Sequence, residues 1–192
     1  LYQAVRHESE AGNHRETVAL ADTLLAWQPL ADTTLEHDAL VMRARSLYLL
    51  EDHGAAEQAF QELLVVLPES DDRRDELTES LAASVYQQGE TLLAAGEPEA
   101  AVAEWLRVAT VAPGTELSAR ASYDAAGQLM ALEAWDDALA AMTGLRSQHP
   151  DHPLTQQLSS RMALAYRETG RWQEAAAELT AIAESSTDPV EQ

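Results

Sequence analysis

Apolar and small residues recur along most of this chain at three- and four-residue intervals, the spacing that places side chains on one face of an α-helix. Four of these runs end in a proline, at Pro29, Pro68, Pro113 and Pro150. A fifth run of the same kind covers 175–187 and lacks the closing proline. Because proline has no amide hydrogen and cannot continue a helix, each of the four runs predicts a helix that ends just before its proline.

A turn signal precedes each run, and a further helical pattern precedes each turn. The turns are predicted at Gly12-Asn13, Asp52-His53-Gly54, Gly96-Glu97-Pro98, Glu133-Ala134 and Gly170-Arg171. Glycine in such a turn can adopt the left-handed conformation that ends a helix. The helical patterns before the later four turns cover 37–50, 81–95, 117–132 and 154–169. The sequence therefore predicts an all-α chain of about ten antiparallel helices in five hairpins.

The composition fits helices that approach each other closely. Alanine occupies 36 positions, whereas phenylalanine occurs once. A close-packed core must therefore be built mainly from small residues, with Leu, Val and scattered aromatic side chains filling the gaps.

Small residues, an aromatic residue and a proline recur at matching places in the five hairpins. The third and fifth hairpins match best, with Gly89, Leu92, Gly96, Ala101, Trp105 and Pro113, and with Ala163, Tyr166, Gly170, Trp172 and Ala175. The others contribute Ala126, Leu129, Trp135 and Ala138; Ala44, Leu47, Ala56, Phe60 and Pro68; and Gly12, Ala21 and Pro29, where Thr17 replaces the usual alanine. In this pattern the chain resembles the tetratricopeptide repeat (TPR) family.

The resemblance implies a right-handed α-α superhelix, a TPR-like solenoid formed by one array over 1–192. Its repeats would cover about 1–29, 34–68, 72–113, 115–150 and 152–187. The family period is close to 34 residues, so the wider proline spacing leaves extra residues, most of them in the charged stretch 69–76. We expect this insert to give the third repeat a long first helix over 72–95, and a charged loop is the alternative.

The resemblance also implies a groove lined by the first helix of each repeat. Transferred residue by residue, the groove positions are Tyr2, Arg6, Arg45, Tyr48, Tyr86, Glu90, Arg120, Tyr123, Met130 and Arg167. Tyrosine and arginine are enriched at binding hot spots, and the arginines favour a protein or peptide partner with acidic and apolar character. The alternative is that the tyrosines bridge adjacent hairpins and are buried in any such array.

Several other functions are disfavoured by the sequence. The formal charge of −21 opposes nucleic-acid binding, which depends on basic residues. No apolar run is long enough to insert into a membrane, and no catalytic motif or phosphate-binding loop is present, so we expect neither an enzyme nor a cofactor. The absence of cysteine excludes cysteine-based metal sites. His149 and His152 are a weak metal-site candidate, and a turn between repeats is the preferred interpretation.

The function implied by the resemblance is therefore a non-catalytic scaffold for protein–protein interaction. The alternative is a spacer or oligomerisation segment of a longer helical-repeat protein, because Ala175, Leu179 and Ile182 form an apolar stripe that a homodimer through the C-terminal helix would cover. The long first helix is similar to those of TPR-type proteins of bacterial envelopes, which would imply a periplasmic or membrane-tethered location. Since the chain begins at Leu1 rather than Met, we expect it to be part of a longer protein.

Overall fold

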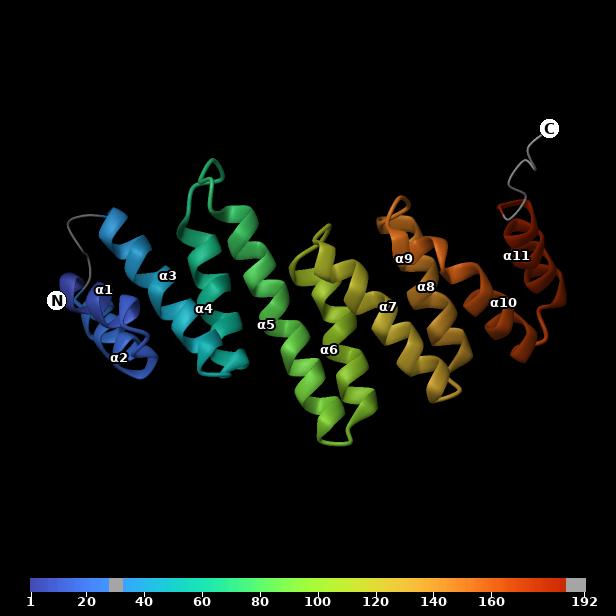
Figure 1. Ribbon diagram of the computed structural model, residues 1–192, viewed down its shortest axis with the longest axis horizontal. Helices are drawn as coiled ribbons and strands as arrows, with labels where there is room; N and C mark the ends of the chain where they lie inside the picture. Colours follow the sequence, from blue (N-terminus) through green and yellow to red (C-terminus); the bar gives the residue numbers. More distant parts are fainter. Residues whose placement is uncertain (28–32, 186–192) are drawn as a thin grey trace. The chain divides into compact units, whose positions relative to one another are not determined.

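The computed structural model describes residues 1–27 and 33–185, and within these ranges it contains only helices and the loops between them (Figure 1). The predicted all-α class is therefore confirmed. The chain divides into two compact units, Leu1–Gln88 and Gly89–Gln192, and each is described by itself. Pro29 and the final residues of the fifth predicted run lie outside the described residues, and the single five-repeat array stays a prediction.

The first unit contains four helices and most of a fifth. They are α1 (Tyr2–Glu10), α2 (His14–Leu25), α3 (Thr33–Leu49), α4 (His53–Val66) and α5 (Arg74–Ala94) as far as residue 88. Helices that follow one another pack together, α1 with α2, α2 with α3 and α3 with α4, and α1 also packs against α3. The first helices of successive hairpins thus lie side by side, as the sequence pattern predicts.

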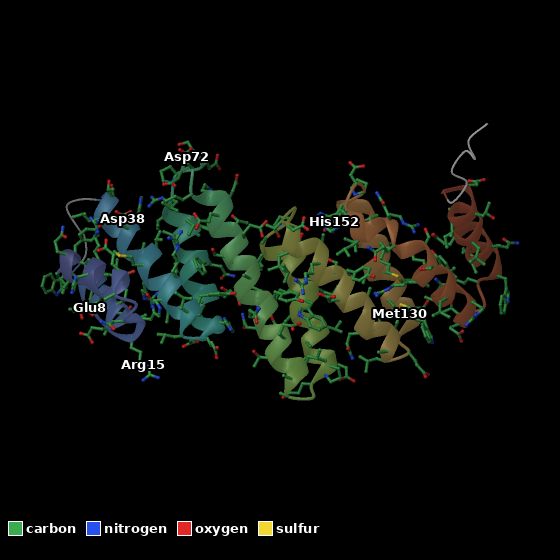
Figure 2. All side chains as sticks on the ribbon, in the orientation of Figure 1. Glu8, Arg15, Asp38, Asp72, Met130 and His152 are labelled. Atoms are coloured by element: carbon green, nitrogen blue, oxygen red, sulfur yellow. The ribbon has the colours of Figure 1, made fainter. Side chains whose placement is uncertain are left out.

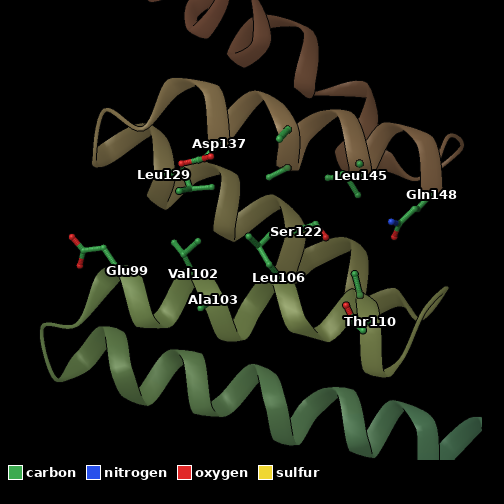
Figure 3. A pocket seen from close by; sticks show the side chains of 14 residues that line it. Glu99, Val102, Ala103, Leu106, Thr110, Ser122, Leu129, Asp137, Leu145 and Gln148 are labelled. Atoms are coloured by element: carbon green, nitrogen blue, oxygen red, sulfur yellow. The ribbon is translucent and has the colours of Figure 1, made fainter.

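The second unit begins with the last turns of α5 and continues with six helices. They are α6 (Pro98–Val111), α7 (Glu116–Ala131), α8 (Trp135–Gln148), α9 (Pro153–Gln156), α10 (Leu158–Glu168) and α11 (Trp172–Ser185). The predicted helix over 154–169 is broken into α9 and α10 at Gln157, so eleven helices replace the expected ten among the described residues. Both α6 and α8 pack on α7 and leave an open groove between them (Figure 3).

The same hydrogen bond closes each of the five hairpin turns. The amide after the turn donates to the carbonyl five residues earlier, at 2.8–3.1 Å, from Asn13 to Glu8, Asp52 to Leu47, Glu97 to Leu92, Ala134 to Leu129 and Arg171 to Tyr166. This is the Schellman pattern, which needs a left-handed residue just before the donor. Gly12, Gly96 and Gly170 fill that position, as do Glu51 (φ 62°) and Glu133 (φ 59°).

The second turn differs from the prediction in one residue. The sequence pattern assigned the helix stop to Asp52-His53-Gly54, but the left-handed residue is Glu51 and Gly54 lies inside α4. Asp52 caps α4 instead, since its side chain accepts a hydrogen bond from the amide of Ala55 at 3.2 Å. The expectation was wrong because the Schellman hydrogen bond, rather than the nearest glycine, sets the turn.

Small buried side chains occupy equivalent positions in each hairpin. Seven residues before the left-handed residue stand Val5, Ala44, Gly89, Ala126 and Ala163, and five residues after it stand Thr17, Ala56, Ala101, Ala138 and Ala175, all of them buried. The hydroxyl of Thr17 needs a hydrogen-bond partner because the residue is buried, and it donates to the carbonyl of Asn13 at 3.1 Å. Small residues therefore recur in register at buried positions, as the resemblance predicts.

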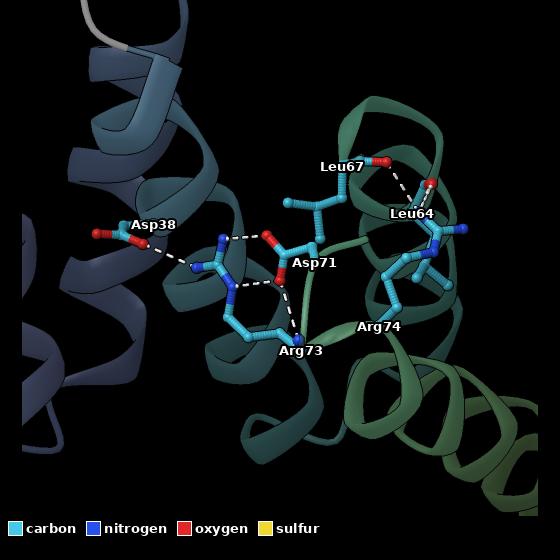
Figure 4. Close-up of polar contacts among 6 residues, drawn as sticks. All are labelled: Asp38, Leu64, Leu67, Asp71, Arg73 and Arg74. Atoms are coloured by element: carbon cyan, nitrogen blue, oxygen red, sulfur yellow. Dashed lines mark hydrogen bonds and ion pairs between the residues drawn. The ribbon is translucent and has the colours of Figure 1, made fainter. Parts of the chain in front are cut away.

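The charged insert forms a short loop followed by a long helix. α5 begins at Arg74 and has 21 residues, so the predicted long first helix is confirmed with a start two residues later. Arg74 Nη1 donates to the carbonyls of Leu64 and Leu67 at 2.8 and 2.9 Å (Figure 4). These carbonyls lie at the end of α4 and have no intrahelical partner, so Arg74 ties the start of α5 to the end of α4.

Charged side chains project from the helices and loops, including Glu8, Arg15 and Asp72 (Figure 2). Among the described residues, none of the helices combines the length and apolar character that crossing a membrane requires.

Candidate functional site

The first cleft of the candidate site lies along the first helices of the first unit. It has a volume of about 430 Å³ and is lined from α1 by Tyr2 and Arg6, from α3 by Asp38 and Arg45, and from the start of α5 by Glu76, with Ser9, Glu10, Val41, Met42 and Arg73 completing it. Three of the ten predicted groove residues, Tyr2, Arg6 and Arg45, therefore meet in one cleft.

A chain of hydrogen bonds runs along one side of this cleft. The Tyr2 hydroxyl donates to Asp38 Oδ2 at 3.1 Å, and Arg73 Nη1 donates to Asp38 Oδ1 at 2.9 Å. Arg73 also holds Asp71 through Nε and Nη2, each at 2.9 Å (Figure 4). These hydrogen bonds from Arg73 hold the pKa of Asp71 well below its usual range and raise the pKa of Arg73. The network orients the Tyr2 ring and connects the loop before α5 to α3.

A second cleft of about 390 Å³ adjoins the first. Its apolar lining comes from Tyr48 and Leu49 of α3, Phe60 of α4 and Ala83 of α5, and its polar lining from Arg45, Glu76, Glu79 and Ser80. Arg45 and Glu76 line both clefts, and their ion pair, with Nη2 2.6 Å from Oε1, stands at the boundary. The two clefts thus form one groove, named here the first-helix groove, that crosses α1, α3 and α5.

Tyr48 and Leu49 give the second cleft its apolar character. The Tyr48 ring packs at 58° to the His53 ring, with centroids 5.1 Å apart. Leu49 remains 59% exposed although it ends α3 beside the cleft. An exposed leucine beside an aromatic floor is typical of a surface that covers an apolar group of a partner.

The first-helix groove is close to neutral, although the chain is strongly acidic. Arg6, Arg45 and Arg73 face Glu10, Asp38, Glu76 and Glu79. Arg6 Nε lies 2.7 Å from Glu10 Oε1, and both side chains are more than half exposed. Exposed pairs of this kind contribute little to stability because water and salt screen them, so their carboxylates can be exchanged for those of a partner at small cost.

The remaining predicted residues fall into different surroundings. Tyr86 is buried, with 7% of its surface exposed, which matches the alternative that some tyrosines pack between helices. Glu90 and Arg120 are exposed, and Arg120 Nε lies 3.6 Å from Asp124 Oδ2. Met130 is half-buried on α7 (Figure 2).

Tyr123 is held by two neighbours within the second unit. Its hydroxyl lies 3.4 Å from Gln157 Oε1, and the guanidinium of Arg161 lies over its ring at 4.0 Å from the centroid. A guanidinium over an aromatic face is attracted by the ring quadrupole. The pair connects α7 to α10 and leaves Tyr123 half-buried.

Arg167 lies in a separate cleft at the last hairpin. This cleft of about 410 Å³ lies between α10 and α11 and is lined by Leu164, Arg167, Trp172 and Leu179 among others. Arg167 Nη2 pairs with Glu168 at 2.7 Å. Trp172 and Leu179 are 66% and 58% exposed. Of the apolar stripe predicted on the last helix, Leu179 reaches the surface, Ile182 is half-buried and Ala175 is buried.

His149 and His152 serve as hydrogen-bonding residues at the junction of α8 and α9. His149 Nε2 lies 2.9 Å from Ser118 Oγ, and His152 Nε2 lies 3.0 Å from Glu116 Oε1. His152 Nδ1 accepts the amide of Leu154 at 3.1 Å and so caps α9. Burial and the neighbouring His152 lower the pKa of His149. Across residues 1–27 and 33–185 no group of three or more carboxylates or imidazoles is placed to hold a metal ion.

Sequence reasoning missed several residues of the first-helix groove. Arg73 stands in the charged insert, and nothing in the local pattern connects it to Asp38, 35 positions earlier. Leu49 was predicted only as a helix position, and Phe60 only as a residue of the repeat pattern. No local signal in the sequence marks either residue as part of a cleft.

Comparisons with known proteins give only distant similarities. No protein-family model matches the sequence, and a search of curated proteins gives no match. Among solved structures, MamA is 15% identical over 99% of this chain and 95% of its own, with a TM-score of 0.45. YrrB, described as a TPR protein with an unusual peptide-binding site, is 16% identical over 96% and 84%, with a TM-score of 0.43.

A third solved structure holds the nearly identical TPR-like repeats of a kinesin light chain from Podosopora anserina. It is 16% identical over 95% of this chain and 91% of its own, with a TM-score of 0.39. Identities this low relate to the fold alone, and at these TM-scores the repeated turns and small-residue positions described above carry the assignment. The chain has an all-α, TPR-like fold built from helical hairpins.

Proposed function

We propose that this chain is a non-catalytic scaffold that binds a segment of another protein in the first-helix groove of its first unit. The observation that supports the proposal is the pair of adjoining clefts that share Arg45 and Glu76. Tyr2, Arg6, Arg45 and Tyr48 line these clefts from two neighbouring first helices. Tyrosine and arginine are the side chains that most often supply binding energy in such interfaces.

The partner segment carries an apolar side chain next to a carboxylate. The apolar side chain enters the cleft formed by Tyr48, Leu49 and Phe60, where covering Leu49 removes apolar surface from water. The carboxylate pairs with Arg45 and displaces the exposed carboxylate of Glu76, whose own contribution is small. A planar guanidinium suits this exchange because it holds a carboxylate by two parallel hydrogen bonds.

Peptide selection on the protein tests this proposal. A library of random 15-residue peptides is selected on the full chain, and the binders are measured against Arg45→Glu and Tyr48→Ala. Arg15→Glu is the matched control, because Arg15 is exposed on α2 and lines none of the described clefts. We expect binders that contain an acidic and an apolar residue, and that lose at least tenfold in affinity with Arg45→Glu and with Tyr48→Ala but not with Arg15→Glu. Equal affinity for all variants would refute the proposal.

The exposed Trp172 and Leu179 favour the second candidate, an oligomerisation or spacer segment. Light scattering of the same protein samples separates the two. A dimer that Leu179→Glu dissociates, together with no peptide binding in the first-helix groove, would support the second candidate instead.

A further inference from the structure

A further open groove lies between two second helices of the second unit, whereas the first-helix groove follows the first helices of the first unit. It has a volume of about 540 Å³, with α6 and α8 as its walls and Ser122 and Leu129 of α7 as its floor (Figure 3). This groove, named here the second-helix groove, shares no residue with the first-helix groove. Leu106 on its α6 wall is 38% exposed.

The next pair of second helices, α8 and α11, is connected by charged side chains. Between α8 and α11, Arg146 holds Glu178 through two hydrogen bonds of 2.7 and 2.9 Å and also reaches Ser159 at 3.2 Å. Counted from the left-handed turn residues, the positions of Arg146 and Glu178 correspond to Ala109 on α6 and Ala141 on α8. Two alanines therefore stand where the neighbouring junction has a partly buried ion pair.

In the first unit, charged side chains also connect two second helices, through the first helix that lies between them. Arg43 of α3 pairs with Asp22 of α2 at 2.5 Å and approaches Glu62 of α4 at 3.8 Å. By the same count Arg43 corresponds to Ala125 on α7, and its partners Asp22 and Glu62 correspond to Leu106 on α6 and Gly144 on α8. At both comparison junctions charged side chains pair between the helices, whereas small and apolar residues occupy the equivalent positions at α6 and α8, beside an open groove.

Gly144 widens the groove without serving the packing of the chain itself. A Cβ atom added at this position would meet nothing within 4 Å. Glycine in the middle of a helix is unfavourable relative to alanine, because it increases the conformational freedom lost on folding. A backbone without side chain at this place permits a partner to approach α8 closely.

The dimensions and charges of the groove define its occupant. The lining runs along α6 from Glu99 to Thr110, and the eleven residue steps between them span about 16 Å, or three helical turns. The only charged residues in the lining are Glu99 and Asp137, in the first turns of α6 and α8. Among the described residues neither carboxylate has a basic partner. The groove is therefore mainly apolar, with the uncharged polar residues Thr110, Ser122 and Gln148 in its lining, and acidic at one end.

We propose that the second-helix groove docks an amphipathic α-helix of another protein, with small and apolar residues on the docked face and a lysine or arginine at the end that meets Glu99 and Asp137. Close helix packing against small residues supplies the contact area. The basic residue supplies orientation, since opposite charges fix the register of an interface. A second copy of this chain is disfavoured as occupant because its charge of −21 repels the acidic end.

A display library of 18-residue helical peptides provides the probe. One face is varied among Ala, Val, Ile and Leu, and the first and last turns among Lys, Arg, Glu and Gln. We expect selected peptides to carry a basic residue in one terminal turn and to bind the full chain. Affinity should fall at least tenfold with Ala109→Arg/Ala141→Glu, which transfers the ion pair of the next junction into the groove, and with Gly144→Gln. Because an added Cβ at Gly144 meets nothing, the second variant keeps the test valid if the first fails to fold.

Two further variants complete the test. Glu99→Gln/Asp137→Asn should weaken peptides with a basic end several-fold, and Arg45→Glu should leave binding unchanged, which separates this groove from the first-helix groove. The inference is overturned if no selected peptide loses affinity with Gly144→Gln. It is also overturned if light scattering finds a dimer of the free chain that Gly144→Gln dissociates, because a second copy would then occupy the groove.

Discussion

The contact between Gly89 and Trp105 gives the sharpest test of the packing described here. Both residues are buried, and Trp105 is 3% exposed. A Cβ atom placed on Gly89 would lie 2.5 Å from Trp105 Nε1, 2.6 Å from Cδ1 and 3.1 Å from Cε2. Carbon atoms in good contact stand about 3.5–4.0 Å apart, so Gly89→Ala must displace the indole ring by about 1 Å within a packed core.

The expected change in the free energy of unfolding follows from comparing Gly89→Ala with Gly144→Ala. Both replace a glycine within a helix, a change that by itself stabilises by about 1 kcal/mol. At Gly144 nothing opposes this gain, because no atom lies within 4 Å of the added methyl group. At Gly89 the overpacking costs about 1–3 kcal/mol. The free energies of unfolding of the two variants should therefore differ by about 1–3 kcal/mol, with Gly144→Ala above the wild type.

Urea unfolding followed by circular dichroism measures these differences, and thermal unfolding should place the two midpoints at least about 2 °C apart for a chain of this size. Trp105→Phe in the Gly89→Ala background is the matched control, since the smaller ring relieves the contact. Equal stability of Gly89→Ala and Gly144→Ala would refute the reasoning, because the indole would then have room to move.

Two predictions concern the dependence of stability on pH. The pKa of His149 is lowered in the folded chain by burial and by His152, so its neutral form is favoured and stability should fall as the pH drops below its unfolded value of about 6.5. In His149→Gln the loss of thermal stability between pH 7 and pH 5 should be smaller, and an unchanged slope would contradict this. The pKa of Asp71 is also lowered, by hydrogen bonds from Arg73, so its contribution is present above an unfolded pKa of about 3.9 and is lost as the pH falls further. Asp71→Asn should therefore flatten the acid part of the stability profile, and wild-type behaviour of this variant below pH 4 would count against the role of the Arg73 contact.

The turn register shows how far local sequence information extends. Gly12, Gly96 and Gly170 mark three turns directly, and Glu133 was predicted at the fourth. Glu51 was missed, since glutamate in a left-handed conformation is locally unfavourable and Gly54 stood nearby. Counting five residues back from Ala56 would have found it, because all five hairpins share the spacing from the left-handed residue to a small buried residue, which is alanine in four of them and Thr17 in the first.

The candidate site was predictable in its components but not in its arrangement. Tyr2, Arg6, Arg45 and Tyr48 follow from the helical positions of the repeat, and the structure brings them to the first-helix groove. Tyr86 occupies a comparable sequence position and is nevertheless buried. Whether a tyrosine at such a position is exposed depends on the neighbouring helix, and this neighbour lies outside any local window of sequence.

The sequence by itself determined most of the helices, four of the five turns and the recurring small residues, because helix periodicity, proline and left-handed turn positions act over a few residues. Only the tertiary structure decided which charged side chains meet, such as Arg73 with Asp38 and Arg146 with Glu178. It also decided that an open groove lies between α6 and α8, where the equivalent positions carry small and apolar residues in place of ion pairs. Contacts of this kind join residues about 35 positions apart, and their distances depend on how successive hairpins pack rather than on the preferences of any single segment.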